Sequence, residues 1–429
     1  MHEYDFIGVG LGPFNLGLAA LTEPLDELDG LFLEARDRFD WHPGMMLPDA
    51  TLQVPFLADL VTMADPTSPF SFLAFLKDTG RLYSFYIRES FYPLRAEYNQ
   101  YCQWVSDRLT SVRFGEAVER VEHDGSAYVV RTNQGESYRT KRLVLGTGTQ
   151  PKVPDACAGL GGPAIHTSDY LTRKADLQDT GSITVVGSGQ SAAEVYADLL
   201  ADIESHGYTL SWVTRSPRFF PMEYTKLTLE MTSPEYTAYF QALPGEKRDE
   251  LLREQRGLYK GISSDTINDI FDTLYAKQVH GGVDTNLLTC AALTGAEWDG
   301  TAYTLDLHHT EQHEDLRLRT ESLVLATGYA SSVPAFLDPV RDRIRWDERG
   351  RYDASSTYAV DRAGEEIFVQ NGEEHTHGFV APDLGMGAYR SSVIIAAMVG
   401  REVYPIEKRI AFQQFGVPDH LRLMAGAAR

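Results

Sequence analysis

Two short apolar runs, each leading into a glycine-rich turn, dominate the hydrophobic pattern of this 429-residue chain. The first run covers residues 6–9 and the second covers residues 183–186. After the first turn, leucines and alanines at residues 16–21 fit a helix that packs on a sheet. A strand, a tight glycine turn and a helix in this order are typical of a dinucleotide-binding unit. The glycines are Gly8, Gly10 and Gly12 in the first turn and Gly187 and Gly189 in the second.

Both turns suit the binding of phosphate groups. Glycine permits the tight turn out of a strand and lets the backbone approach a pyrophosphate without a side chain in the way. The following helix offers free amide donors and the positive end of its dipole. Pro13 and Asn15 follow the first turn, and Gln190 and Ser191 follow the second. Two such units predict two bound dinucleotides and redox chemistry between a flavin and a nicotinamide.

The charge at the end of the next strand distinguishes the two units. The apolar run at residues 30–34 ends in Glu34, which stands 24 residues after Gly10. A carboxylate at this place usually accepts a hydrogen bond from a ribose hydroxyl, which favours FAD at the first unit. The run at residues 210–215 ends in Arg215, and an arginine there holds a 2′-phosphate, which favours NADPH over NADH. The alternative is that both are solvated charges at strand ends.

The overall pattern predicts an α/β fold with two Rossmann-like dinucleotide-binding domains, for FAD and NADPH, and a smaller, partly helical substrate region. We expect residues 1–165 to form the first part of the FAD-binding domain. Residues 166–325 are expected to form the NADPH-binding domain, with a helical insertion of the substrate region near residues 222–280. Residues 326–429 then return to the FAD domain and end in a segment that covers the flavin and the substrate.

Two apolar runs of the strand type end in the same pair of residues. Residues 143–146 precede Thr147 and Gly148, and residues 323–326 precede Thr327 and Gly328. We interpret these repeated turns as the two crossings between the paired nucleotide domains. An ordinary exit from a strand is the alternative for each turn.

Residues 37–100 interrupt the alternation of strands and helices and are rich in aromatic residues, proline and histidine. A loop-rich insertion of this length is usually functional. Its aromatic residues either shield a reactive site from water or pack as ordinary core. They include Trp41, Phe56, Phe70 and Phe72.

Composition excludes several classes of function. The formal charge of −22 would repel nucleic acid and anionic membranes, and no apolar run reaches the length of a membrane span. Three scattered cysteines give neither a metal spacing nor a disulfide framework, so a cytoplasmic location is expected. His375 and His377 alternate as on a strand, but no acid or cysteine stands at metal spacing, so we expect no metal.

The segments at residues 5–15, 41–45, 66–69 and 326–329 closely resemble those of the flavin-dependent N-hydroxylating monooxygenases of siderophore biosynthesis. The likeness covers nearly the whole chain and is greatest to members that hydroxylate cadaverine or putrescine. It implies FAD and NADPH as cofactors, O2 as a cosubstrate, a C4a-hydroperoxide of the flavin as the oxidant, and a hydroxylamine product used for hydroxamate siderophores.

The resemblance also implies roles for particular residues. Gln53 matches the residue beside the flavin ring, and it is the catalytic candidate. The cofactor-binding candidates are Gly8, Gly10, Gly12, Pro13, Asn15, Glu34, Trp41, His42, Gln53, Gly187, Gly189, Gln190, Ser191, Arg215, Thr327, Tyr329 and Leu384.

Two departures from the family pattern concern the substrate. Ala58 stands where amino-acid hydroxylases have a lysine for the substrate carboxylate, and Gly385 stands where they usually have a serine. A buried carboxylate without a partner costs several kcal/mol, so these residues favour a diamine. Asp383 is the candidate acceptor for its second ammonium. The alternative is an L-lysine N6- or L-ornithine N5-monooxygenase in which another base replaces the lysine.

Two other classes of protein fit the sequence less well. A flavin disulfide reductase needs a pair of redox cysteines, which this chain does not have. A non-catalytic nucleotide sensor would not need the 41–95 insertion and the tail motifs. The expected partners are therefore a small diamine and O2, without nucleic acid or membrane, in a homo-oligomer that is a tetramer or a dimer.

Overall fold

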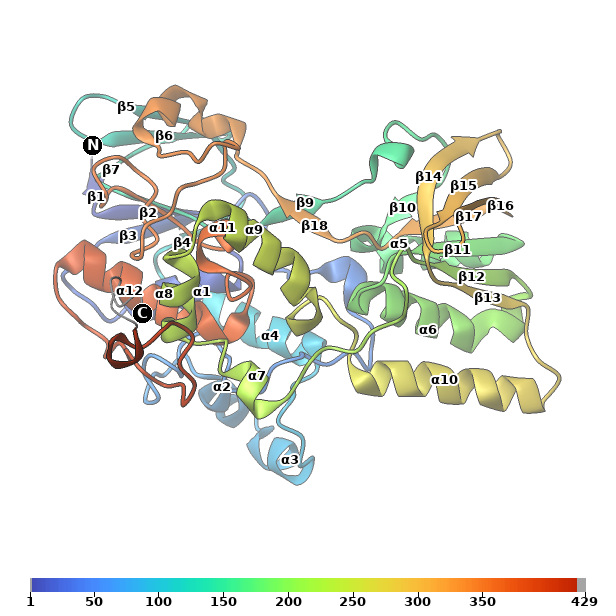
Figure 1. Ribbon diagram of the computed structural model, residues 1–429. Coiled ribbons are helices and arrows are strands. Elements are labelled where there is room, and N and C mark those ends of the chain that lie inside the picture. The colour runs from blue at the N-terminus through green and yellow to red at the C-terminus, as the bar shows by residue number, and fades with distance from the viewer. Residues whose placement is uncertain (1, 423–429) are drawn as a thin grey trace, which may run out of the picture.

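The computed structural model describes residues 2–422, and it is built around two parallel five-stranded sheets (Figure 1). The first sheet joins strands from both ends of the chain. Phe6 and Ile7 point to opposite faces of this sheet, and both are fully buried because each face is covered. The strand order is β19 (Ile367–Val369), β8 (Leu143–Leu145), β2 (Phe6–Val9), β3 (Gly30–Leu33) and β4 (Val112–Arg113).

Helices cover one face of the first sheet, and a small sheet covers the other. The helices are α1 (Pro13–Thr22), α4 (Arg95–Ser106) and α12 (Gly387–Val399), which share one hydrophobic core with Phe6 and Phe32. The small sheet packs on Ile7 and Leu31 through its buried residues. Its strands are β1 (Glu3–Tyr4), β7 (Ser137–Thr140), β6 (Tyr128–Thr132) and β5 (Val118–His123).

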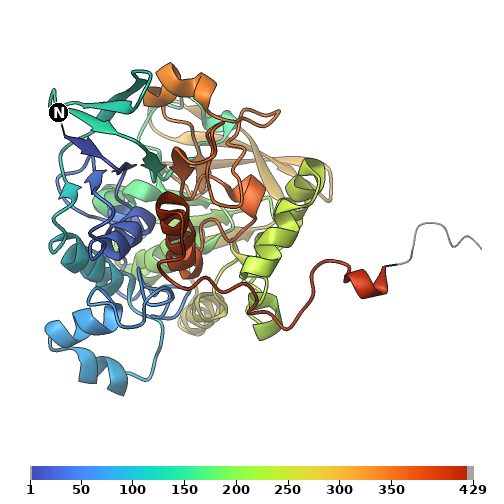
Figure 2. The same cartoon turned by 90° about the vertical axis from the view of Figure 1, so that its left-hand side faces the viewer.

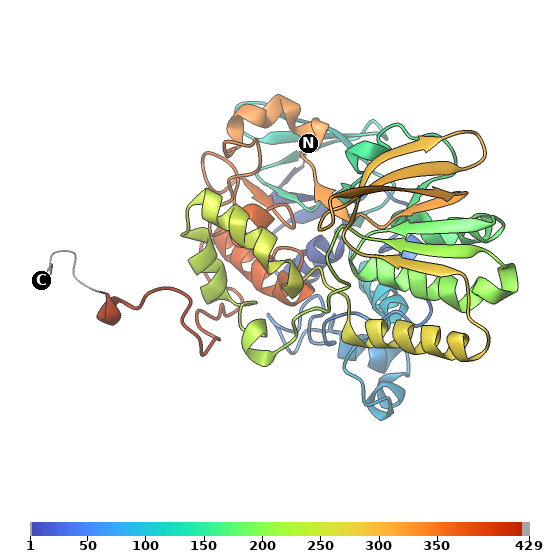
Figure 3. The ribbon, with the colours of Figure 1, turned by 45° about the vertical axis from the view of Figure 1, so that its right-hand side comes forward.

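The second five-stranded sheet has helices on one face and antiparallel strands on the other (Figure 3). Its strand order is β10 (Ile165–His166), β17 (Ser322–Leu325), β11 (Ser182–Val186), β12 (Thr209–Val213) and β13 (Thr285–Leu288). The helices are α5 (Tyr170–Gln178), α6 (Gln190–His206) and α10 (Ser264–Val279). The antiparallel strands are β14 (Ala291–Trp298), β15 (Tyr303–His309) and β16 (Glu314–Thr320).

Two short strands connect the halves of the molecule. β9 (Thr149–Pro151) follows β8, and β18 (Tyr329–Ser331) follows β17. They pair with each other in antiparallel orientation between the two large sheets (Figure 1). This confirms the interpretation of the repeated Thr-Gly turns as crossings, and it brings Thr327 and Tyr329 to the junction.

The helical insertion packs on the C-terminal part of the chain (Figure 2). Tyr236 and Phe240 form one hydrophobic cluster with Phe379, Val380 and Met386. The insertion contains α7 (Lys226–Leu229), α8 (Pro234–Gln241) and α9 (Gly245–Glu254), and the aromatic insertion nearer the N-terminus contains α2 (Phe72–Asp78) and α3 (Leu82–Ile87).

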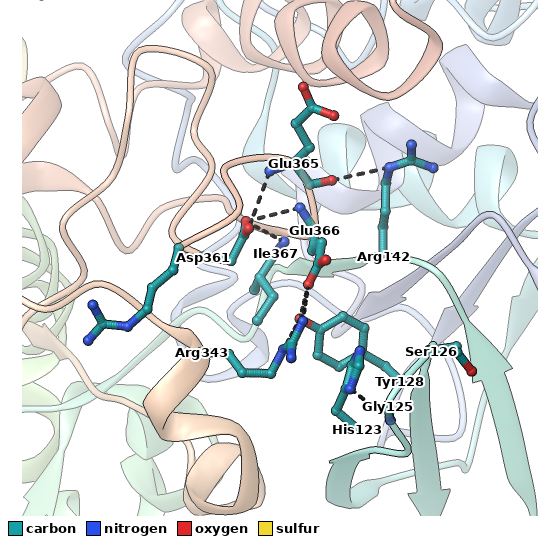
Figure 4. Close-up of polar contacts among 12 residues, drawn as sticks. His123, Gly125, Ser126, Tyr128, Arg142, Arg343, Asp361, Glu365, Glu366 and Ile367 are labelled. Atoms are coloured by element: carbon teal, nitrogen blue, oxygen red, sulfur yellow. Dashed lines mark hydrogen bonds and ion pairs between the residues drawn. The ribbon is translucent and has the colours of Figure 1, made fainter.

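A polar cluster fixes the turn that returns the chain to the first sheet (Figure 4). The buried carboxylate of Asp361 accepts hydrogen bonds from the backbone amides of residues 364–367. Glu366 accepts from Arg343 and from the hydroxyl of Tyr128, each at 2.7 Å. These contacts place the start of β19 beside β8.

One local prediction was wrong. His375 and His377 lie in a short helix, α11 (Glu374–His377), and not on a strand. Two residues are too few to establish a period of two, and the amide of His377 donates to the carbonyl oxygen of Glu373 in a helical turn. Within residues 2–422, no three His, Cys, Asp or Glu side chains are grouped as a metal site requires. The same residues contain no helix long and apolar enough to span a membrane.

Candidate functional site

The first glycine turn has the shape that a phosphate group needs. Gly10 has φ +83°, and a Cβ there would lie 2.6 Å from the carbonyl oxygen of Gly146. Gly12 is the N-cap of α1, and no other atom lies within 4 Å of the place that its Cβ would occupy. The helix N-terminus is therefore open on the side where an anion would approach. Pro13 occupies the first turn of the helix, where its missing amide costs nothing.

Glu34 lies directly beside this turn. Its carboxylate accepts a hydrogen bond from the amide of Leu11 at 2.7 Å and another from the amide of Arg36 at 2.9 Å. It follows the last residue of β3, at the edge of the sheet where such folds bind their ligands. Its position fits the predicted acceptor for a ribose hydroxyl, and the glycine turn with Glu34 fits FAD.

Asn15 supports the turn from behind. It is 1% exposed, and its amide donates to the carbonyl oxygen of Gly10 at 2.7 Å. Its own oxygen accepts from Gln370 at 2.7 Å, next to the end of β19. Because these polar contacts lie inside the protein, the structure places Asn15 as a support of the turn.

The second glycine turn leads into α6. A Cβ on Gly187 would lie 2.2 Å from the carbonyl oxygen of Ala326, so only glycine fits there. Gly189 is the N-cap of α6, and Ser191 lies in its first turn. Arg215 stands two residues after β12 and is exposed. This exposed guanidinium group is accessible to an outside anion such as a 2′-phosphate.

Aromatic rings from the first insertion meet the crossing strand. The rings of Trp41 and His42 are 4.9 Å apart, and His42 lies 5.8 Å from Tyr329 on β18. His166 packs on Tyr329 at 5.0 Å, and burial lowers the pKa of His166. Together these rings line the junction of the two nucleotide units. Thr327 stands two residues before Tyr329 in the chain, and its hydroxyl donates to the carbonyl oxygen of Lys152.

The other aromatic residues of this insertion pack as core. Phe72 is 1% exposed and lies within 5.5 Å of the rings of Phe85 and Tyr101. Phe56 and Phe70 are partly buried against the same cluster. The alternative of core packing therefore applies to Phe72, whereas Trp41 is partly buried against the same core and also contacts His42 at the junction.

Gln53 connects the two nucleotide units. Its side-chain amide donates to the side-chain oxygen of Gln190 at 3.2 Å. Its backbone oxygen accepts from the hydroxyl of Tyr224, which comes from the helical insertion. The catalytic candidate is thus held by both the second turn and the insertion.

Ala58, Asp383 and Gly385 come together although they are far apart in the sequence. A Cβ on Gly385 would lie 3.9 Å from that of Ala58 and 3.2 Å from a carboxylate oxygen of Asp383. Burial raises the pKa of Asp383, and hydrogen bonding to the Gly385 amide and the nearby Thr232 hydroxyl oppose that rise. Leu384 lies between Asp383 and Gly385 and packs partly against the core of the first unit.

Sequence reasoning missed three features of the site, namely two side chains of the helical insertion and one ion pair. Tyr224 and Thr232 reach it from the helical insertion, and no motif marks them. The carboxylate of Glu194 forms an ion pair with Arg95 at 2.8 Å across the junction. Both residues stand near helix N-termini in the sequence, but nothing in the sequence indicates that the two helices meet.

A buried ion pair lies beneath the first turn. Glu373 and Arg390 are 0% and 1% exposed, and their charged atoms are 3.1 Å apart. The guanidinium group of Arg390 also stacks over the ring of Phe14 at 4.5 Å. The pair therefore supports the start of α1 from the C-terminal segment.

Comparison with known proteins identifies the family. The model for L-lysine 6-monooxygenase/L-ornithine 5-monooxygenase matches residues 2–331. The chain belongs to this family. The predicted resemblance is thereby confirmed.

Relatives and solved structures agree with this assignment. The chain is 50% identical over 419 residues to a putrescine N-hydroxylase of Shewanella oneidensis, covering 96% of this chain and 84% of the relative. The structure of the cadaverine monooxygenase of desferrioxamine biosynthesis from Erwinia amylovora, bound to FAD, has a TM-score of 0.96 at 53% identity, covering 97% and 99% of the two chains. An ornithine N-hydroxylase of Kutzneria sp. 744 with reduced FAD, NADP+ and L-ornithine has a TM-score of 0.85 at 28% identity, covering 93% and 99%. The predicted α/β fold class is confirmed.

Proposed function

We propose that this chain is an FAD- and NADPH-dependent monooxygenase that N-hydroxylates one primary amine of an aliphatic diamine, cadaverine or putrescine, for hydroxamate siderophore biosynthesis. The observation that carries the choice of substrate is the meeting of Ala58, Gly385 and Asp383. The relatives described above as putrescine and cadaverine enzymes support the same choice.

The charge at this place distinguishes a diamine from an amino acid. Ala58 and Gly385 offer no cation or hydroxyl to a substrate carboxylate, and Asp383 would repel it. Arg390, whose charge also reaches Asp383, is already paired with Glu373. The second ammonium of a diamine supplies the positive charge that a partly buried carboxylate needs. Asp383 is therefore the proposed acceptor for the distal end of the substrate.

The remaining residues bind the cofactors and exclude water. FAD is held by the first turn, with Glu34 on its ribose, and NADPH is held by the second turn, with Arg215 on its 2′-phosphate. When bound, the two cofactors would supply the hydride and the activation of O2 for the reaction. The rings of Trp41, His42 and Tyr329 shield the junction from water. Gln53 orients the reacting groups between the two turns.

The substrate proposal is tested with specificity constants for cadaverine, putrescine, lysine and ornithine at saturating NADPH and O2. Hydroxylamine formation should be large for at least one diamine and small for both amino acids. The difference between four and five carbons should be weaker, about 1–3 kcal/mol, since a methylene in an apolar channel contributes little more. A higher constant for lysine or ornithine than for both diamines would show that a carboxylate site exists elsewhere.

We also propose that the enzyme works in the cytoplasm as a homo-oligomer, a tetramer or a dimer. The three cysteines are free and buried, which suits a reducing compartment. Large apolar side chains are exposed on α3 and α10, which favours self-association over a monomer. They are Tyr83, Tyr86, Ile87, Phe271, Tyr275 and Val279. Light scattering of the purified holoenzyme measures the oligomeric state, and a monomer at micromolar concentration would contradict it.

A further inference from the structure

The side chain of Gln190 uses all of its hydrogen-bonding capacity inside the protein. Its oxygen accepts from the backbone amide of Ser263 at 2.8 Å and from the side-chain amide of Gln53 at 3.2 Å. Its nitrogen donates to Glu194 at 3.0 Å and to the hydroxyl of Thr266 at 3.2 Å. An amide has two acceptor and two donor positions, so none remains for another partner. Gln190 thus joins the first unit, the second unit and the N-terminus of α10.

The chemistry of the partners sets the direction of this amide. A backbone N–H such as that of Ser263 only donates, and an ionised carboxylate such as that of Glu194 only accepts. Inverting the Gln190 amide would place two donors together at Ser263 and two acceptors together at Glu194. The oxygen of Gln190 must therefore face Gln53, which in turn must present its NH2 group. The side-chain oxygen of Gln53 is left as the free end of that amide.

Glu194 is itself held in place from the opposite unit. Arg95, at the start of α4, donates to both of its carboxylate oxygens, at 2.8 and 3.0 Å. Arg95 also donates to the carbonyl oxygen of Met45 at 2.8 Å. The side chains of Arg95 and Glu194 are only 13% and 8% exposed, so water competes weakly for either charge. This bidentate geometry gives the carboxylate one orientation.

We propose that Glu194 is a positioning residue for Gln53 and acts through the Gln190 amide. With its carboxylate fixed by Arg95, Glu194 acts together with the Ser263 amide to direct the oxygen of Gln190 towards Gln53, and the oxygen of Gln53 is thereby directed into the site. The measurement of hydroxylamine formation that tests this role rests on the proposed function, whereas the spectrum of bound FAD tests the role independently of that function. Glu194 in this role affects how much hydroxylamine is formed per NADPH oxidised, and not the folding of either unit.

The experiment compares E194Q and E194D with the wild-type holoenzyme. Gln at position 194 offers both an NH2 group and an oxygen, so only the backbone amide of Ser263 still opposes inversion of the Gln190 amide and, with it, of the Gln53 amide. Asp at this position keeps the negative charge opposite Arg95, but its carboxylate is withdrawn by one methylene from both Arg95 and Gln190. Both variants should form about tenfold less hydroxylamine per NADPH oxidised. When the reacting groups are misoriented, the reduced cofactor is oxidised without hydroxylation of the amine.

The matched control is D198N. Asp198 lies on the same helix, α6, and binds Lys174 at 2.7 Å, without contact to Gln190. The visible circular dichroism of bound, oxidised FAD gives a readout that does not depend on turnover. The spectrum should change in E194Q and E194D and remain that of the wild type in D198N, at equal FAD content.

Two results would overturn the proposal. One is an E194D enzyme with wild-type coupling and a wild-type spectrum, which would make Glu194 only the ion-pair partner of Arg95. The other is a D198N enzyme with losses equal to those of the Glu194 variants, which would make the effect a general one of α6. If the wild type hydroxylates no diamine, the proposed function fails, and the FAD spectrum still decides the role of Glu194.

Discussion

At the scale of single residues, we expect Arg215 to determine the choice of NADPH over NADH. Its guanidinium group is exposed beyond β12. R215A should raise the Michaelis constant for NADPH about ten- to a hundredfold and leave that for NADH nearly unchanged, since one charge-assisted contact contributes roughly 1.5–3 kcal/mol. Steady-state kinetics with both cofactors measures this. R218A removes an equal charge from the same exposed loop and serves as the control. Equal effects of R215A on NADPH and NADH would contradict the assignment.

Asp383 is the residue on which the substrate proposal depends. D383N keeps the size of the side chain and removes the charge that holds the second ammonium. We expect its Michaelis constant for cadaverine and putrescine to rise about ten- to a hundredfold, with a smaller change in kcat. T232V removes a neighbouring hydroxyl without removing the charge, so its effect should be smaller. A D383N enzyme with unchanged constants for both diamines would place the distal ammonium elsewhere.

At the scale of elements, the turn before β19 depends on one carboxylate. Asp361 accepts from four successive backbone amides, and D361N would place an NH2 group against some of them. The free energy of unfolding should fall by about 3 kcal/mol, since hydrogen bonds to a charged group contribute roughly 1.5–3 kcal/mol each and are not additive. Chemical denaturation of the holoenzyme measures the change. E365Q alters an exposed charge in the same turn and should lie within about 0.5 kcal/mol of the wild type. A similar loss in both variants would show that net charge, and not the turn, is responsible.

Elements with a strong local pattern were predicted well. The strands before both glycine turns and the helices after them formed as expected, because glycine geometry and hydrophobic periodicity act within a few residues. The region of α11 was mispredicted because two histidines carry too little periodicity. Helices α7 to α9 were expected only as a helical insertion, since their packing partners lie in the C-terminal segment.

At the scale of the whole molecule, acid should destabilise the fold through His377. Burial and the charge of Arg390 lower the pKa of His377 from 6.5 to about 3. The unfolded chain therefore binds a proton at this residue before the folded chain does, and stability is lost as the pH falls from about 6.5 towards 3. Between pH 7 and pH 5 this residue should remove roughly 2 kcal/mol.

The variant H377Q isolates this contribution. Glutamine does not titrate, so the loss of stability between pH 7 and pH 5 should be smaller in H377Q than in the wild type. The neighbouring groups Glu373, Arg390 and His375 are common to both proteins, and their titration cancels in the comparison. Chemical unfolding curves of the wild type and H377Q, each recorded at pH 7 and at pH 5, measure the difference. Equal losses in both proteins would show that another group dominates acid unfolding.

Activity should also increase with pH, for a separate reason that lies in the substrate. An ammonium has no lone pair with which to attack an electrophilic oxygen, so the reacting amine must be deprotonated. Hydroxylamine formation should rise from neutral into mildly alkaline pH while the enzyme remains folded. Rates at saturating NADPH and O2, with circular dichroism at each pH as the control for folding, measure this. A steady fall of the coupled rate over the same range would contradict it.

The sequence by itself determined the two nucleotide units, the charges at the ends of their second strands and the family. These features are local, because a glycine turn, a strand and a helix N-terminus are set by residues that are neighbours in the chain. For the same reason Glu34 was placed correctly beside the first turn, and Arg215 lies exposed just beyond β12, while their contacts with cofactors stay predictions.

Only the tertiary structure decided which distant residues share a site. The family resemblance assigned Ala58, Asp383 and Gly385 to one substrate site, but their contact depends on the packing of the C-terminal segment over the first insertion. The hydrogen-bond network around Gln190 likewise requires that α4, α6 and α10 meet at the junction of the two units. Such contacts follow from hydrophobic burial over the whole chain, which leaves no local signal in the sequence around each residue.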